Sequence, residues 1–176
     1  NRTGVLLPSG TPLTTAAFFD ALRARRTFAT EDRSGQLVLT GNGHVMGESF
    51  ANSGPLTLVA NYASTSGQTA QRVQFFEGVP GRNGTVTQLT EGSGTYSVTP
   101  ANGKHFYYAV VTQADGLRLW SAPIWVDQGG TPPPTDTTPP TVGASETGSS
   151  GTITLLATAS DNVGVSKVEF YVDGVL

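Results

Sequence analysis

The feature that most constrains this sequence is a series of short segments in which apolar and polar residues alternate, each ending in a turn signal. The segments lie between residues 36 and 126 and read QLVLTGNG, PLTLVANYA, RVQFFEG, TVTQLT, GTYSVTP, KHFYYAVVTQ and LRLWSAPIWV. A period of two is typical of β-strands with one buried face, because successive side chains point to opposite sides. Seven such strands in about 95 residues predict a mainly β fold, an Ig-like or fibronectin-III-like sandwich.

Two places in this series carry more specific predictions. The segment KHFYYAVVTQ is apolar on both of its faces, which predicts a central strand. Asp115-Gly116 follows it, and this pair tolerates positive φ at both central positions of a tight hairpin. Pro123 has no amide to donate to a ladder, so it predicts a sheet edge or a bulge.

One helix is expected before the strands, within residues 11–28. Thr14 or Thr15 can cap its first turn, because a hydroxyl accepts a hydrogen bond from an otherwise unpaired amide. Its apolar stripe consists of Phe18, Phe19 and Leu22. We expect this stripe to pack only partly on the sandwich.

Composition excludes several classes of protein. The formal net charge is -3, and Arg25 and Arg26 are expected in the last helical turn, where cations complement the helix dipole. A nucleic-acid-binding surface would need more basic residues or interleaved aromatics. Cysteine is absent, which excludes disulfides and zinc–thiolate sites. No apolar run reaches the roughly 18 residues of a membrane span.

The second half of the sequence indicates a spacer and a further module. Residues 127–140 read DQGGTPPPTDTTPP, an extended Pro/Thr linker. Beyond it, two sets of apolar residues predict the inward faces of a truncated second sandwich: Ile153, Leu155, Ala157 and Ala159, then Val168, Phe170 and Val172. The predicted organisation is 1–34 terminal helix, 35–128 β-sandwich, 129–140 linker and 141–176 partial Ig-like domain. The sequence starts without methionine or a signal pattern, so we expect a piece of a longer protein.

No catalytic residue, cofactor site or transition-metal site is predicted. His44 is close to Glu48 in the sequence, and His105 begins the predicted central strand. Imidazole metal sites need three or four convergent ligands, so we expect His44 in a solvated loop and His105 as a surface or cross-strand partner. No GxSxG nucleophile elbow occurs.

Two weaker candidates remain. Asp161, Asn162 and Asp173 offer oxygen ligands for Ca²⁺, although an Asx-type turn explains them more simply. Trp120 and Trp125, with Tyr96, Tyr107 and Tyr108, could form a glycan-stacking platform if they share an exposed face. Core packing is the alternative, because sandwich interiors also use tyrosine and tryptophan.

The stretch FFDALRARRTFAT…LVLTGNGHVMGE resembles the C-terminal end of PHP (polymerase and histidinol phosphatase) superfamily metallohydrolases of the secreted, carbaryl-hydrolase-like branch. The matching residues are Ala21, Leu22, Ala24, Arg26, Thr27, Ala29, Thr30, Asn42, Gly43, Met46 and Gly47. WSAPIWV resembles the closing strand of the sandwich appended to these enzymes, so the resemblance covers residues 1–128. It implies a missing N-terminal catalytic domain that binds divalent metal ions, and none of the family's ligands falls on this sequence.

Residues 136–176 are similar to the tandem bacterial Ig-like repeats of secreted and surface proteins, through DTTPPTV and ASDNVGVSKVEFYVDG. The two resemblances together imply a non-catalytic C-terminal segment that supports and tethers a secreted bacterial hydrolase, with the missing domain as its partner. The alternatives are a module that binds carbohydrate or cell-surface glycan, and a structural adhesin stalk.

Overall fold

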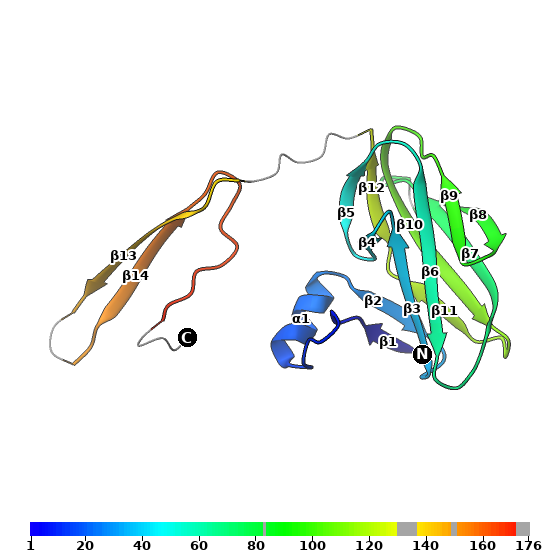
Figure 1. The fold of residues 1–176 in the computed structure, drawn as a ribbon, viewed down its shortest axis with the longest axis horizontal. Helices are drawn as coiled ribbons and strands as arrows, with labels where there is room; N and C mark the ends of the chain where they lie inside the picture. The colour runs from blue at the N-terminus through cyan, green and yellow to red at the C-terminus, as the bar shows by residue number, and fades with distance from the viewer. Residues whose placement is uncertain (83, 130–136, 149–150, 172–176) are drawn as a thin grey trace. The chain divides into compact units, whose positions relative to one another are not determined.

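The computed structural model describes residues 1–82, 84–129, 137–148 and 151–171. The chain divides into two compact units, Asn1–Pro132 and Pro133–Leu176 (Figure 1). The first unit contains one described helix, α1 (Thr15–Arg23). Its described strands are β1 (Arg2–Val5), β2 (Thr27–Thr30), β3 (Gly35–Gly41), β4 (His44–Val45), β5 (Ser49–Asn52), β6 (Leu56–Ser64), β7 (Ala70–Gly78), β8 (Val86–Gly92), β9 (Thr95–Val98), β10 (Gly103–Gln113), β11 (Arg118–Ser121) and β12 (Ile124–Gln128).

The strands of the first unit form two sheets that pack face to face, which confirms the predicted Ig-like sandwich. One sheet has the order β4-β3-β6-β9. The other runs β1-β2-β11-β10-β12-β5, and β7 and β8 extend it from the opposite edge of β10. Strand β10 pairs with β7, β11 and β12, so the predicted central strand is central.

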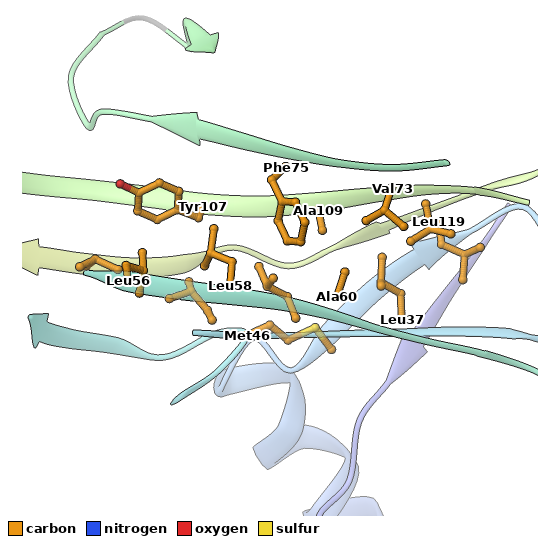
Figure 2. Packing of buried hydrophobic residues seen from close by; sticks show 14 residues of the cluster. Leu37, Met46, Leu56, Leu58, Ala60, Val73, Phe75, Tyr107, Ala109 and Leu119 are labelled. Carbon is orange, nitrogen blue, oxygen red and sulfur yellow. The ribbon is translucent and has the colours of Figure 1, made fainter. Parts of the chain in front are cut away.

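The core lies between the two sheets. Leu58 of β6 faces Phe75 of β7 and Tyr107 of β10 across this space, and all three side chains are fully buried (Figure 2). The inward positions alternate with outward ones along each strand, as the sequence pattern requires. The other members of the core are Leu37, Leu39, Met46, Leu56, Ala60, Val73, Ala109, Val111, Leu119, Ile124 and Val126.

The hairpin between β10 and β11 forms as predicted, but its turn differs. Gly116 has a φ of 87°, whereas Asp115 keeps a negative φ. The amide of Gln113 donates to the carbonyl of Leu117, and the amide of Gly116 donates to the carbonyl of Gln113. The loop of this hairpin has three residues, and only its last one, Gly116, is left-handed, so the turn does not use positive φ at Asp115.

Pro123 lies at a bulge, one of the two positions predicted for it. Val110 of β10 pairs with Trp120 of β11, and Tyr107 of β10 pairs with Ile124 of β12. The four residues from Tyr107 to Val110 thus face the five residues from Trp120 to Ile124, so one extra residue separates β11 from β12. Beyond the bulge the outer neighbour also changes, from β2 to β5.

The N-terminal segment extends the larger sheet. Strand β2 pairs with β11, and β1 pairs with β2, so the predicted boundary at residue 34 falls inside the first unit. Thr14 caps α1 by accepting a hydrogen bond from the amide of Ala17. The helix ends at Arg23, and Arg25 has a φ of 56°, so the prediction that Arg25 and Arg26 lie in the last turn is wrong.

Helix α1 contributes little to the core. Ala21 is its one buried residue, whereas Phe18 is 37% exposed and Phe19 is 49% exposed. The predicted partial packing of the apolar stripe is confirmed for these two side chains.

In the described part of the second unit, β13 (Thr141–Thr147) and β14 (Thr154–Ser160) form an antiparallel hairpin. Leu155 shares one face with Ala157 and Ala159 as predicted, but it is 45% exposed. The predicted strand over 168–172 is absent from residues 168–171, and Val172 lies outside the described residues. A two-stranded hairpin offers no opposing sheet against which Val168 and Phe170 could pack.

Candidate binding surface

Both tryptophans of the chain lie on the outer face of the larger sheet. In β11 and β12 the buried residues are Leu119, Ser121, Ile124, Val126 and Gln128. Trp120 and Trp125 alternate with them and are partly exposed. A separation of five residues would place two side chains on opposite faces of an unbroken strand. The extra residue at the bulge shifts the alternation of side chains by one, so both tryptophan rings lie on the same face of the sheet.

Three more aromatic side chains surround the tryptophans. Phe106 of β10 pairs with Trp125, and Tyr108 of β10 pairs with Phe76 of β7. The rings of Tyr108 and Phe76 stack with centroids 4.9 Å apart and planes 8° apart. Burial raises the pKa of Tyr108. We call this set the aromatic face: Phe76, Phe106, Tyr108, Trp120 and Trp125.

A glycine lets the aromatic face lie flat on the sheet. A Cβ atom on Gly78 would lie 2.0 Å from Cζ of Phe106, so the Phe106 ring covers the place where a side chain would stand. Gly78 and Phe106 are direct cross-strand partners in β7 and β10. The absence of a side chain at residue 78 is therefore what allows the ring to rest on the backbone.

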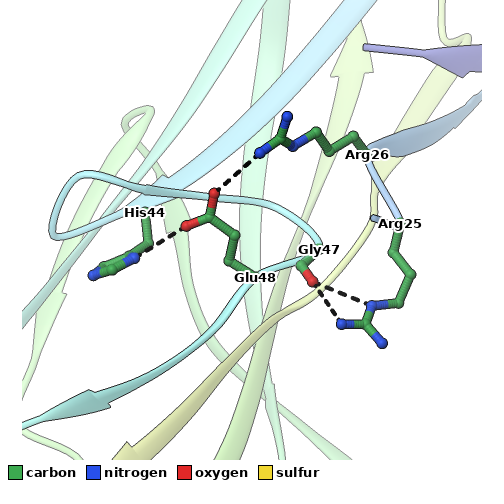
Figure 3. Close-up of polar contacts among 5 residues, drawn as sticks. All are labelled: Arg25, Arg26, His44, Gly47 and Glu48. Carbon is green, nitrogen blue, oxygen red and sulfur yellow. Dashed lines mark hydrogen bonds and ion pairs between the residues drawn. The ribbon is translucent and has the colours of Figure 1, made fainter. Parts of the chain in front are cut away.

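Two arginines stack on the tryptophans. The Cζ atom of Arg25 lies 4.7 Å from the ring centroid of Trp125, and that of Arg118 lies 4.9 Å from the ring centroid of Trp120. The Nε and Nη2 atoms of Arg25 donate to the carbonyl of Gly47 at 3.1 and 3.0 Å (Figure 3). These bonds fix the guanidinium of Arg25 at one end of the aromatic face.

Arg118 is held less firmly. Its Nε atom lies 3.6 Å from Oε2 of Glu31, an ion pair without a side-chain hydrogen bond among the described residues. Its backbone amide donates to the same carboxylate oxygen at 2.9 Å. Glu31 thus neutralises part of the charge of Arg118, whereas Arg25 contacts an uncharged carbonyl.

Next to this surface, three polar side chains lie close together: His44 of β4, Glu48 just before β5 and Arg26 from the segment after α1 (Figure 3). Nδ1 of His44 is 3.0 Å from Oε2 of Glu48, and Nη2 of Arg26 is 3.5 Å from Oε1 of Glu48. The His44 ring also stacks on Phe50 at 3.8 Å. His44 and Glu48 are both partly exposed to solvent, but the prediction of a solvated loop for His44 is wrong, because His44 lies in β4, where it pairs with Gly41 of β3, and stacks on Phe50.

His105 lies away from this group, at the start of β10, and is buried. Its Nδ1 atom is 2.9 Å from Oε1 of Glu77, and its Nε2 atom is 2.8 Å from the carbonyl of Ala101. The hydroxyl of Tyr107 donates to the same oxygen of Glu77 at 2.7 Å, and burial together with Glu77 raises the pKa of Tyr107. His105 is therefore a cross-strand partner, one of its two predicted roles; its Nε2 atom is hydrogen-bonded, whereas its Nδ1 atom lies close to Glu77 without a hydrogen bond among the described residues.

The Ca²⁺ candidates form a turn. Oδ1 of Asp161 accepts hydrogen bonds from the amides of Val163 and Gly164 at 2.8 and 2.9 Å, which is an Asx-type turn. Asp173 lies outside the described residues. Within residues 1–82, 84–129, 137–148 and 151–171, no three His, Cys, Asp or Glu side chains converge on a possible metal site. Over the same residues, no helix has the length and apolarity to cross a membrane.

The sequence identified part of the aromatic face. Tyr107 belongs to the core, and Tyr96 packs near Phe75 with ring centroids 6.1 Å apart. Phe76, Phe106, Arg25 and Arg118 were not predicted as members of a site. The cross-strand partner of Trp125 is Phe106 and that of Tyr108 is Phe76, so the two phenylalanines can be found only when the register of the sheet is known.

Comparison with known families identifies one region. Residues 133–176 match the model of a bacterial Ig domain, which covers the second unit. No curated protein and no solved structure matches the chain. The matched domain is an accessory or surface module, a type often found outside the cell or at its surface.

Proposed function

We propose that this chain is the non-catalytic C-terminal accessory and tethering segment of a secreted bacterial metal-dependent hydrolase of the PHP type. The bacterial Ig domain at residues 133–176 supports the accessory and surface part of this role. The resemblance of residues 18–48 to the end of PHP metallohydrolases supports the choice of parent enzyme. In this proposal the divalent metal ions belong to the hydrolase domain, because the sequence carries none of that family's ligand motifs.

The observation that carries the proposal is the exposed apolar face of α1. Phe18 and Phe19 are 37% and 49% exposed, and Leu13, just before the helix, is 78% exposed. Elsewhere in the described part of the first unit, the exposed large apolar side chains are Val86 and Leu117, each 38% exposed, so the grouping of three at α1 and the residues just before it favours an interface. A hydrolase domain packed against α1 would cover it.

The proposal is tested on the parent protein, which in this proposal carries the hydrolase domain before this segment. We expect the parent to retain stoichiometric divalent metal after dialysis and to hydrolyse phosphoester or related substrates, and the 176-residue chain to do neither. A parent in which further Ig domains replace the histidine-rich hydrolase motifs would support an adhesin stalk instead.

The contact of α1 can be tested separately. Replacing Phe18 and Phe19 together with serine should loosen the hydrolase domain in the parent, seen as faster proteolysis between the two domains. The same change at Leu117, an exposed apolar residue of the β10–β11 turn that is 38% exposed, is the matched control. Equal proteolysis of both variants would contradict the proposed interface.

A further inference from the structure

The outer face of a sandwich normally carries polar residues, because it faces water. Here the outward positions at the centre of the larger sheet hold five aromatic rings, and all five are partly exposed. Val110, an outward residue paired with Trp120, is only 7% exposed, and the rings of Tyr108 and Phe76 stack on each other. The Phe106 ring, which covers the place of a side chain at Gly78, and the exposed parts of the other rings offer an apolar surface that the C–H faces of sugars can contact.

Cations mark both ends of the aromatic face. Arg25 uses Nε and Nη2 on the carbonyl of Gly47, and no described acceptor contacts its Nη1. Arg118 has a side-chain exposure of 51%, and its Nη groups have no acceptor among the described residues. A planar guanidinium with free N–H groups is well suited to a carboxylate.

The spacing of the two cations fits an extended ligand. Trp125 pairs with Phe106 and Trp120 pairs with Val110, four residues further along β10. Four residues of a strand span about 13 Å. Phe106 and Tyr108 lie along β10 on the same outward face and offer apolar contact between the two charged ends.

We infer that the aromatic face binds an acidic polysaccharide, with uronic-acid carboxylates on Arg25 and Arg118 and sugar rings on the aromatic side chains between them. This goes beyond the proposed accessory role and does not depend on a hydrolase parent. It gives the segment a ligand of its own, a carboxylated glycan such as those of cell walls and extracellular matrices. The interaction combines ring stacking, which tolerates different sugars, with charge pairing, which selects for carboxylates.

The test uses polygalacturonate and its fully methyl-esterified form, which has the same backbone without charge. Trp120 and Trp125 are the chain's only tryptophans, so intrinsic fluorescence of the full chain reports directly on the aromatic face. We expect a saturable change in emission with polygalacturonate and a much smaller one with the ester. No binding to either polymer, or equal binding to both, would overturn the inference.

Variants locate the site. Arg25→Gln should weaken binding about tenfold or more, because it removes a charge-assisted hydrogen bond, and Arg118→Gln should weaken it less because Glu31 already shares its charge. Arg82→Gln, an exposed arginine on the β7–β8 turn, is the matched control and should bind normally. If Arg82→Gln weakens binding as much as Arg25→Gln, general charge attraction explains the result and the site is refuted.

A second readout covers the case in which a tryptophan variant misfolds. Migration of the chain through gels containing polygalacturonate reports binding without fluorescence, so Trp125→Ala can be compared with Tyr171→Ala. Tyr171 is 59% exposed and lies in the second unit. Retarded migration that is lost in Trp125→Ala, kept in Tyr171→Ala and accompanied by native circular dichroism supports the site; unchanged migration of Trp125→Ala overturns it.

Discussion

One sequence pattern occurs twice in this chain and has two structural outcomes. Residues 72–79 read RVQFFEGV and residues 167–175 read KVEFYVDGV. The first copy forms most of β7, with Val73 5% exposed and Phe75 fully buried. In the described part of the second copy, 167–171, no strand is assigned, and Val168 and Phe170 are 44% and 43% exposed.

The difference shows that the pattern alone does not determine a strand. β7 lies between β8 and β10, and its inward residues face the four-stranded sheet. The described part of the second unit contains a single hairpin, β13–β14, and no opposing sheet. β-propensity measures how well a residue fits a half-buried pleated surface, and only the first unit supplies such a surface.

The largest difference in stability is expected when the equivalent aromatic ring is removed from each copy of the pattern. Phe75→Ala should destabilise the first unit by about 3–5 kcal/mol, because it leaves a cavity between the sheets. Phe170→Ala should change the same unfolding transition by less than about 0.5 kcal/mol. Denaturant unfolding followed by tryptophan fluorescence measures both, since both tryptophans lie in the first unit. A comparable loss in the two variants would contradict the comparison.

A second comparison uses two glycines on either side of β4, in the β3–β4 and β4–β5 turns of the first unit. Gly43 and Gly47 have φ of 88° and 93°, so alanine is strained at both. A Cβ atom at Gly47 would lie 2.1 Å from the backbone carbonyl oxygen of Ala24, whereas at Gly43 nothing lies within 4 Å.

We expect Gly43→Ala to cost about 1 kcal/mol from backbone strain, and Gly47→Ala to cost at least about 2 kcal/mol more. Gly47→Ala should also free Arg25, which changes the tryptophan emission of the folded state. Equal unfolding free energies for the two variants would show that contact with the α1 segment contributes nothing to stability.

A smaller effect on stability is expected at α1, because its large apolar side chains are partly exposed, as they are in the second unit. Polar substitution of Phe19 in the isolated chain should change the free energy of unfolding by less than about 0.5 kcal/mol, because the ring is 49% exposed. The variant should also be more soluble. A loss of several kcal/mol would show that α1 belongs to the core of the first unit.

The smallest effect concerns two carboxyl groups with lowered pKa. A hydrogen bond from Gln113, 81 residues away, is the main cause for Asp32, and an ion pair with Lys167, two residues away, is the main cause for Glu169. Unfolding separates Asp32 from Gln113, whereas Lys167 stays beside Glu169 in the unfolded chain.

The lowered pKa of Asp32 therefore stabilises the fold above the unfolded-state pKa, near pH 4, and this contribution is lost as the pH falls below it. Asp32→Asn should make the acid-side loss of stability shallower, and Glu169→Gln should leave it unchanged. Unfolding midpoints between pH 3 and pH 7 provide the measurement. A change in slope with Glu169→Gln would mean that Glu169 has a partner that depends on folding.

Local patterns predicted much of the first unit because strand alternation, turn residues and the Thr14 cap act over a few residues. The register of the strands depends on contacts between distant segments, so the features that depend on register were not predicted. LRLWSAPIWV reads as one strand, yet the bulge divides it into β11 and β12 with different outer neighbours.

The candidate surface depends on the same detail. Trp120 and Trp125 share a face only because of the extra residue between β11 and β12. Arg25 reaches Trp125 because α1 ends at Arg23, before the two arginines that the sequence placed in its last turn. The helix propensity of residues 23–26 did not predict where α1 ends. The helix ends where Ala24 closely approaches the backbone of Gly47, and this contact joins segments that are distant in the sequence.

The pairing of β12 with β5 has a mechanical consequence for a segment that tethers. The two strands run parallel, with Trp125 opposite Ser49 and Gln128 opposite Asn52. The side chain of Asn52 also donates to that of Gln128 at 2.8 Å. β12 is the last strand before the Pro/Thr linker, and on its other edge it pairs with β10. Tension applied through the linker therefore pulls β12 along its own axis, and both ladders are loaded in shear, so their hydrogen bonds share the force instead of opening one after another.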